Sequence, residues 1–188
     1  MKVLVVYYSE TSNTKRVAES ISKEASRGHE TDLKRLEDVN VEDLNGYDII
    51  FFGSTCHSSD LAKPMISFLE AIPPNPQFSM AGFYTHSTYK RDDRRFERAE
   101  EVFDEWAAKG LQTFERVSRE KGIDYRGHFN CMGAPNPGIE AFIKSTVILD
   151  KDEWARYIEE VRKHPDSEDL EDAKSFARKV LTSEANPR

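Results

Sequence analysis

The sequence VLVVYYSETSNT, at residues 3–14, joins an unbroken apolar run directly to a run of short polar side chains. Continuous apolar runs of this length are typical of strands that are buried on both faces of a parallel sheet. The residues that follow, 14–26, place Val17, Ala18 and Ile21 on one face of a predicted helix. The order of strand, polar loop and helix predicts that the loop lies beyond the carboxyl end of a central strand.

The alternation of apolar strands with amphipathic helices continues along the rest of the chain. Further strands are predicted at residues 31–36, 47–52, 80–85 and 125–131, and further helices at 61–72, 94–121, around Trp154 and at 170–181. The long helix at 94–121 is expected to bend at Gly110. Five strands with intervening helices predict a three-layer α/β/α sandwich with a five-stranded parallel sheet. We expect one domain over residues 1–188, with 132–188 as an extended C-terminal segment packed on it.

Composition and charge exclude several classes of function. The formal net charge of −7 argues against a general nucleic-acid partner, because a phosphate-binding surface needs a basic excess. No apolar run approaches the roughly 20 residues that cross a bilayer, and the N-terminal run is too short for a signal peptide. We therefore expect a cytoplasmic protein with no membrane partner. Cys56 and Cys131 form no CxxC or other metal-ligand pattern, so we expect neither a metal site nor a catalytic thiol.

The polar loop at residues 9–14 has the composition of an anion site. Four hydroxyl side chains and one amide occupy five of its six positions, and the following helix points its free N–H groups at the same place. Backbone donors and the helix dipole bind a phosphate without any lysine. The loop lacks the glycines of a Walker loop and of a dinucleotide fingerprint. The alternative is an ordinary N-cap rich in Ser, Thr and Asn, but so many polar groups favour the phosphate.

Residues 9–14 resemble the phosphate loop of flavodoxins, whose pattern after the first strand is Ser/Thr-x-Thr-Gly-x-Thr. Ser9, Thr11 and Thr14 match this pattern, whereas Ser12 stands where the family usually has Gly. The resemblance implies a flavodoxin-like sheet with strand order 2-1-3-4-5. It also implies FMN as the cofactor, with its phosphate held by residues 9–14.

A second resemblance lies at residues 48–64, where DIIFFGSTCH leads to Lys63-Pro64. The corresponding family segment, Gly-Ser-Pro-x-Tyr…Lys-Pro, contacts the isoalloxazine ring. Thr55 replaces the usual Pro, and His57 lies about where the family has an aromatic residue. The resemblance implies that His57 stacks on the ring or hydrogen-bonds to it, and the alternative is a solvated loop histidine.

The third loop, FYTHSTY at residues 83–89, follows the fourth predicted strand. In flavodoxins its counterpart closes over the other side of the ring and donates backbone hydrogen bonds to the pyrimidine edge. Tyr89 is the expected stacking residue, with packing of its ring on the protein surface as the alternative. No catalytic residue is assigned, and the three loops together supply the predicted FMN-binding residues: Ser9, Thr11, Ser12, Asn13, Thr14, Ser54, Thr55, Cys56, His57, Thr85, His86, Ser87 and Tyr89.

Five basic residues lie within residues 90–98, beside the third loop of an otherwise acidic chain. They would suit the phosphate of a pyridine nucleotide or an acidic partner. The alternative is a set of ion pairs on a solvated helix face. The mixture of Arg, Asp and Glu in this stretch favours the ion pairs.

The resemblance implies an electron-transfer protein that serves redox partner proteins, a reductase and an acceptor. Glu10 and Asp60 would lower the potential of the flavin, and nearby basic groups would raise it: Lys90, Arg91, His57 and His86. One alternative is an NAD(P)H-dependent FMN or quinone reductase of the same fold. A weaker alternative is a non-redox phosphate-binding module such as a phospho-acceptor receiver. The sequence is compatible with a monomer or a homodimer.

Overall fold

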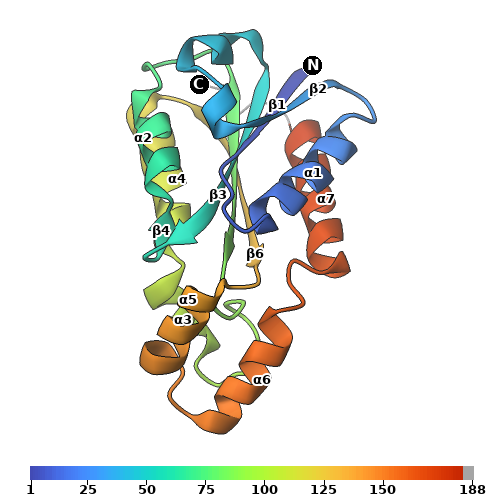
Figure 1. The fold of residues 1–188 in the computed structure, drawn as a ribbon. Helices are drawn as coiled ribbons and strands as arrows, with labels where there is room; N and C mark the ends of the chain where they lie inside the picture. The colour runs from blue at the N-terminus through green and yellow to red at the C-terminus, as the bar shows by residue number, and fades with distance from the viewer. Residues whose placement is uncertain (184–188) are drawn as a thin grey trace.

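The computed structural model describes residues 1–183, and its sheet has the predicted parallel strand order (Figure 1). The order is β2-β1-β3-β5-β6, which is 2-1-3-4-5 when the two-residue β4 is left out. The strands are β1 (Lys2–Tyr7), β2 (Glu30–Arg35), β3 (Ile49–His57), β4 (Asp60–Leu61), β5 (Ser79–His86) and β6 (Asp124–Met132). The predicted flavodoxin-like fold is therefore confirmed. Residues 184–188, the end of the predicted C-terminal segment, lie outside the described residues.

Helices cover both faces of the sheet, with α1 (Asn13–Ala25) and α7 (Ser167–Thr182) on one face and α2 (Lys63–Ala71) and α4 (Lys109–Lys121) on the other. Two 3₁₀ helices, η1 (Leu36–Asp38) and η2 (Val41–Gly46), connect β2 to β3. Successive residues of β1 point to opposite layers. Val5 packs in a cluster with Ile21 and Ala177, whereas Val6 packs in a cluster with Met65 and Phe114. Among residues 1–183, no helix is long and apolar enough to cross a membrane.

Two strands extend further than the sequence indicates. β3 continues to His57 and turns back through Ser58 and Ser59 into the antiparallel β4. Both turn residues have a positive φ, 50° and 68°, as in the type I′ turn of a two-residue hairpin. The segment after Phe52, which the sequence places in a loop, is therefore a strand and a hairpin. In the same way, β5 continues to His86.

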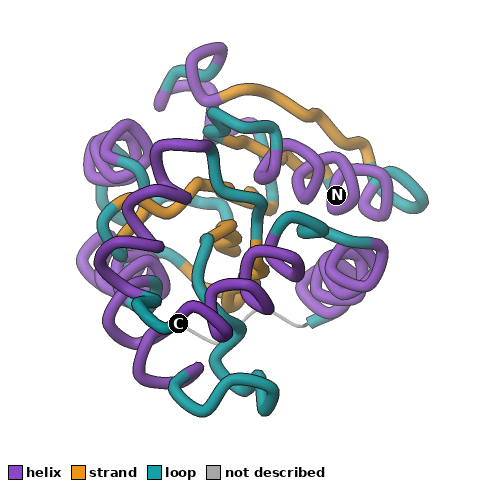
Figure 2. The backbone as a smooth tube through the Cα atoms, turned by 60° about the horizontal axis from the view of Figure 1, so that its bottom comes forward, coloured by secondary structure: helices purple, strands orange, loops and turns teal. Residues whose placement is uncertain are grey.

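A group of helices lies across the carboxyl end of the sheet, at the bottom of Figure 1 and toward the viewer in Figure 2. Its elements are α3 (Ala99–Trp106), α5 (Pro137–Phe142), the π-helix η3 (Ile143–Val147) and α6 (Lys151–Val161). We refer to residues 89–106 and 137–161 as the cap. The cap has an apolar core of its own, which includes Tyr89, Phe96, Val102, Ile143, Ile148 and Tyr157.

The predicted long helix at residues 94–121 is two helices in the structure. α3 ends at Trp106 and α4 begins at Lys109, so the break comes before the bend expected at Gly110. Residues 94–98 precede α3 and lie in the segment that enters the cap. The sequence thus predicts helix here correctly for α3 and α4, but it does not show that α3 leaves the sheet to join the cap.

The ring of Phe83 in β5 packs so closely against Gly53 in β3 that position 53 requires glycine. A Cβ atom there would lie 2.1 Å from the ring of Phe83, so we expect Gly53→Ala to lower the free energy of unfolding by about 1–3 kcal/mol. Gly28→Ala is the control, because a Cβ at Gly28 meets no atom of the described residues within 4 Å. Urea unfolding of both variants checks the prediction, and equal small effects would contradict it.

Candidate functional site

A cavity of about 340 Å³ lies between the carboxyl end of the sheet and the cap. This volume falls in the range of roughly 300–1,000 Å³ that small-molecule sites occupy. The cavity walls come from the segments that follow β1, β3, β5 and β6, and from the cap helices. The winding of the sheet reverses between β1 and β3, which is where ligands bind in sheets of this kind.

The structure brings most of the predicted FMN-binding residues to this cavity. Those that line it are Thr11, Asn13, Thr55, Cys56, His57, Thr85, His86, Ser87 and Tyr89. Ser9, Ser12, Thr14 and Ser54 are not part of its lining among the described residues. Ser54 is buried, and its hydroxyl donates to the carbonyl of Thr55 and accepts from the amide of Ala62, so it holds the start of the hairpin in place.

Several lining residues were not predicted from the sequence. Glu10, Ser58, Ser59 and Thr88 lie within or beside the three loops and could have been included on position alone. The others come from β6 onward and from α3: Val102, Trp106, Gly133, Ala134, Pro135, Asn136, Ile139, Phe142, Ile143, Val147, Ile148 and Tyr157. The apolar members of this set have the spacing of ordinary core residues, so their pattern carries no signal of a cavity.

The first loop differs from an ordinary helix cap in its backbone conformation and in its capping side chain. Ser12, at the N-cap of α1, has a φ of 67° in the left-handed region, and its side chain makes no capping hydrogen bond within the described part of the chain. Glycine adopts this conformation readily, whereas Ser12 adopts it at a cost of about 1–2 kcal/mol. The first N–H groups of α1 have no partner within the helix. They are therefore available to an anion at the positive end of the helix dipole.

Hydrogen bonds fix the first loop against the neighbouring segments. The Asn13 amide donates to the carbonyl of Ala134 over 2.8 Å and to the Thr11 hydroxyl over 3.1 Å. The hydroxyls of Thr14 and Thr85 lie 2.8 Å apart and are buried. Segments that follow β1, β5 and β6 thus hold one another in a fixed arrangement.

The hydroxyl oxygen of Ser9 is buried and has no hydrogen-bond partner among residues 1–183. Leaving such a group unpaired costs about 1–3 kcal/mol. Ser9 directly follows Tyr8, whose amide donates to the carbonyl of Gly53, so the backbone at this point is held by the sheet. A buried hydroxyl without a partner needs a physical explanation, and a ligand that supplies the missing partner is one such explanation.

The end of β3 contributes a hydrogen-bonded pair of side chains at the cavity wall. The imidazole Nε2 of His57 lies 2.9 Å from a carboxylate oxygen of Glu10, and the Tyr8 hydroxyl donates to the other oxygen over 3.0 Å. Both partners are partly exposed, so the attraction between them is screened by water. The pair joins the first loop to the hairpin across the wall of the cavity.

The two thiols have no thiolate character. Burial raises the pKa of Cys56 to about 12, and its Sγ donates to the carbonyl oxygen of Trp106 over 3.6 Å. Burial also raises the pKa of Cys131 well above the usual value. A thiol reacts as its thiolate, so neither residue is activated at neutral pH.

The third loop is more deeply buried than a surface loop. His86 is buried, with Nε2 3.1 Å from Asn130 Oδ1 and Nδ1 3.0 Å from the Thr88 hydroxyl. Burial lowers the pKa of His86 to about 4, so at neutral pH it is uncharged and does not supply the positive charge expected of it. Tyr89 is fully buried and stacks on Phe96 at a centroid distance of 4.1 Å. The ring of Tyr89 thus packs inside the cap while also lining the cavity.

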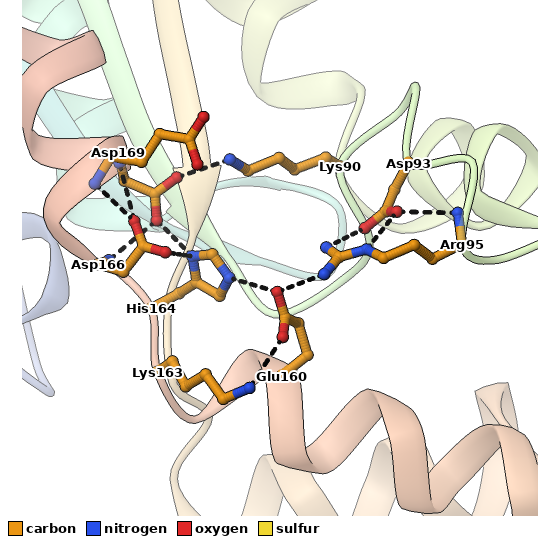
Figure 3. Close-up of polar contacts among 9 residues, drawn as sticks. Lys90, Asp93, Arg95, Glu160, Lys163, His164, Asp166 and Asp169 are labelled. Atoms are coloured by element: carbon orange, nitrogen blue, oxygen red, sulfur yellow. Dashed lines mark hydrogen bonds and ion pairs between the residues drawn. The ribbon is translucent and has the colours of Figure 1, made fainter.

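The basic stretch at residues 90–98 forms ion pairs within the protein (Figure 3). The Lys90 ammonium lies 2.9 Å from Asp169, and the Arg95 guanidinium lies 2.7 Å from both Asp93 and Glu160. Arg91 and Arg98 also pair with acidic residues. The ion-pair interpretation therefore accounts for four of the five basic residues.

His164 connects these pairs into one network, which we call the clamp: Lys90, Asp93, Arg95, Glu160, His164 and Asp169. The imidazole is buried, with Nδ1 bonded to Asp169 and Nε2 3.5 Å from Glu160. Burial by itself lowers the pKa of His164, but the hydrogen bond to Asp169 and its charge raise the pKa overall. The clamp joins the loop that enters the cap to α6 and α7, so it fastens the cap to the sheet.

His164 and Asp169 also lie near Asp166, and ligand atoms of the three residues fall within 4.8 Å of one another. Asp166 caps α7 by accepting the amides of Glu168 and Asp169. Asp169 already accepts from the Lys90 ammonium and from His164. The side chains of all three residues are therefore occupied by partners within the protein. We assign His164 and Asp169 to the clamp, and Asp166 to the N-terminal cap of α7.

Comparisons with known proteins agree with this geometry. The family model described as "Flavodoxin domain" matches residues 4–178. The chain is 24% identical to "Uncharacterized protein MJ0298" of Methanocaldococcus jannaschii, covering 96% of this chain and 99% of that protein. It is 26% identical to "Flavodoxin-like domain-containing protein BilS" of Clostridioides difficile, covering 96% and 97%. Oxidised Flavodoxin 1 from Bacillus cereus has a similar fold, with a TM-score of 0.61 at 14% identity over 98% of this chain and all of that one.

The clamp predicts a pH dependence of stability. Because the pKa of His164 lies above its usual 6.5 in the folded protein, its contribution is complete below about pH 6.5 and is lost as pH rises through the raised pKa. Asp169 has its pKa lowered to about 2 from 3.8, so its contribution is present above pH 3.8 and is lost as pH falls toward 2. We expect His164→Gln to lower the free energy of unfolding by about 3 kcal/mol at pH 5.5.

Urea unfolding of the wild type and of His164→Gln at pH 5.5 and pH 9 measures this effect. The difference in the free energy of unfolding between the wild type and His164→Gln should be smaller at pH 9, because His164 of the wild type then loses its positive charge. Arg91→Gln, which removes an exposed ion pair, is the control and should change stability by no more than about 1 kcal/mol at either pH. A difference for His164→Gln that does not vary with pH would show that the imidazole acts only by packing.

Proposed function

We propose, because this chain belongs to the flavodoxin domain family, that it binds FMN at the carboxyl end of its sheet and passes electrons through it. The observation that carries this proposal is the first loop. It combines a left-handed Ser12, the free N–H groups of α1 and the unpaired buried hydroxyl of Ser9. These groups fit a phosphate, and their neighbours Glu10, Thr11 and Asn13 line a cavity of suitable volume under the cap.

The other loops suit the remaining parts of FMN. Thr55, Thr85 and Ser87 present hydroxyl or backbone groups at the cavity wall, and the hairpin brings His57 to the same wall. When bound, FMN supplies the electron chemistry, and the protein supplies position, charge and shelter from water. In this proposal the hydrogen bonds between the loops keep the binding groups in place before the cofactor enters.

The charges at the cavity favour a low flavin potential. Lys90 is paired with Asp169, Arg91 is paired with Asp104, and His86 is neutral at pH 7. The groups expected to favour an anionic reduced flavin are thus largely neutralised. Glu10 lies at the cavity wall, partnered by His57. We therefore propose that the site disfavours additional negative charge, which suits a protein that donates electrons to redox partner proteins.

A second candidate is an NAD(P)H-dependent FMN or quinone reductase. The observation that favours it is the cap, which covers the end of the sheet and lines the cavity with apolar side chains from α3, α5 and η3. A cavity closed on this side suits a small-molecule electron donor or acceptor. The ion pairs of residues 90–98 argue against that stretch as the site of the nucleotide phosphate.

The cofactor is tested by an absorption spectrum after the protein is mixed with excess FMN and desalted. We expect flavin bands at close to one FMN per chain, and a colourless protein would overturn the proposal. Ser9→Ala should weaken FMN binding about 10-fold or more, because a hydrogen bond to a charged group contributes roughly 1.5–3 kcal/mol. The same change should not destabilise the FMN-free protein, since the hydroxyl has no partner there among the described residues.

Ser26→Ala is the matched control, because the Ser26 hydroxyl donates to the carbonyl of Ser22 at the other end of α1. This variant should bind FMN as the wild type does. If Ser9→Ala also bound FMN normally, Ser9 would have no role at the phosphate.

The choice between carrier and reductase is tested by mixing the FMN-loaded protein with NADPH or NADH without air. A carrier keeps its oxidised spectrum until a separate reductase is added. Rapid bleaching by the nucleotide alone would select the reductase and would reject the carrier as the main function.

A further inference from the structure

Gly133 and Ala134, which directly follow β6, line the cavity, and we call these two residues the junction. The amide of Gly133 donates to the carbonyl of His86 over 2.8 Å, and the carbonyl of Gly133 accepts from the Ser87 hydroxyl over 2.9 Å. A Cβ atom at position 133 would lie 2.8 Å from Nδ2 of Asn13, so the junction also packs closely against the first loop. The junction therefore holds the third loop in place and lies against the first.

Ala134 is bonded to the first loop on one side and to the clamp on the other. Its carbonyl accepts from the side-chain amide of Asn13 over 2.8 Å, and its own amide donates to the carbonyl of His164 over 2.9 Å. Asn13 is the first residue of α1, and the free N–H groups of this first turn are the ones that face an anion in the proposed site. A shift of Ala134 would therefore move Asn13 and the groups that bind the phosphate.

The position of His164 depends on a buried charge at the other end of this connection. The imidazole bonds to Asp169, whose carboxylate is only 1% exposed and also lies 2.9 Å from the Lys90 ammonium (Figure 3). Removing one partner of a buried ion pair leaves an uncompensated charge and destabilises the arrangement around it. Lys90 is not part of the cavity lining among residues 1–183. Any effect of Lys90 on a bound phosphate must therefore pass through other residues or through its charge.

We propose that the junction couples the clamp to the phosphate-binding loop, so that Lys90 and His164 are positioning residues for the phosphate of the cofactor. The carbonyl of His164 holds Ala134, Ala134 holds Asn13, and Asn13 fixes the first turn of α1. Because such coupling is reciprocal, a phosphate in the first loop also stabilises the clamp. The inference rests on the proposed function in taking the first loop as a phosphate site.

The probe is inorganic phosphate, which has no ring to contact the other loops. It is titrated into the FMN-free protein, and its affinity is read from the NMR shifts of the backbone amides at residues 12–14. We expect Lys90→Gln to weaken phosphate binding about 5-fold or more, a typical size for coupling between sites. Lys90→Arg keeps the charge beside Asp169 and should restore the affinity to within about 2-fold of the wild type.

Lys174→Gln is the matched control. The Lys174 ammonium lies 2.9 Å from Glu171 on α7, the same distance and the same helix as in the Lys90 pair, and its side chain is similarly half-buried. Lys174 lies outside the cavity lining of the described chain, so this variant should bind phosphate as the wild type does. If Lys90→Gln also bound phosphate normally, the clamp would have no influence on the first loop and the proposal would be overturned.

A double-mutant cycle with Asn13→Ala separates the junction from a direct effect of charge. Asn13→Ala removes the hydrogen bond to Ala134. In that background, Lys90→Gln should change phosphate affinity by less than about 2-fold, because the connection to the clamp is already broken. Attraction between the Lys90 charge and the phosphate would persist in the same background. Equal effects of Lys90→Gln with and without Asn13 would therefore overturn the junction as the connection. The same cycle is repeated with FMN, followed by flavin absorbance.

Hydrogen exchange in the ligand-free protein tests the connection without any binding step, and it also serves if Lys90→Gln does not fold. Asn13→Ala should speed the exchange of the Ala134 and His164 amides about 5-fold or more, because their loop-side support is lost. Circular dichroism checks that the variant is folded. Unchanged exchange at both amides would overturn the inference. A wild type that binds neither phosphate nor FMN would instead overturn the proposed function, so the two failures are distinguishable.

Discussion

The structure depends on burying a parallel sheet from both sides. β1 and β3 present apolar residues to two helical layers at once, so their polar groups can appear only where the strands end. Because the strands run in the same direction, those ends meet at one edge of the sheet. The amides of α1, the hairpin after β3 and the loop after β5 are therefore brought together by the sheet itself, and the cavity forms where they converge.

The sandwich could be predicted from the sequence because it rests on local patterns. The unbroken apolar run at residues 3–8 is typical of a buried strand, the apolar face of α1 has the period of a helix, and the polar residues at 9–14 mark the loop between them. The family resemblance then supplied the strand order, and the fold agrees with it. The length of β3 was missed because Ser58 and Ser59 take positive φ without the Asn or Gly that usually announces such a turn.

The cap could not be predicted in this way. Val102 and Ile143 have the spacing of any core-facing helix residue, and nothing in that spacing distinguishes a core on the sheet from a separate one. The clamp could not be predicted either, because Lys90 and Arg95 form ion pairs with residues that are far away in the sequence. The charge of Lys90 was visible in the sequence, but its neutralisation by Asp169 was not. Long-range pairing, rather than composition, decides whether these cations face a ligand or the protein.

The cap also has a consequence for the order in which the molecule folds. Its two segments are joined through contacts such as that between Tyr89 and Glu153, which are 64 residues apart in the chain. Contacts of such long range form late, because closing a long loop costs entropy before any contact repays it. We therefore expect the cap to assemble late, and the cavity to be completed only then. Because the apolar core of the cap is separate from the clusters that bury the sheet, we expect that the cap can open and admit a ligand while the sheet stays folded.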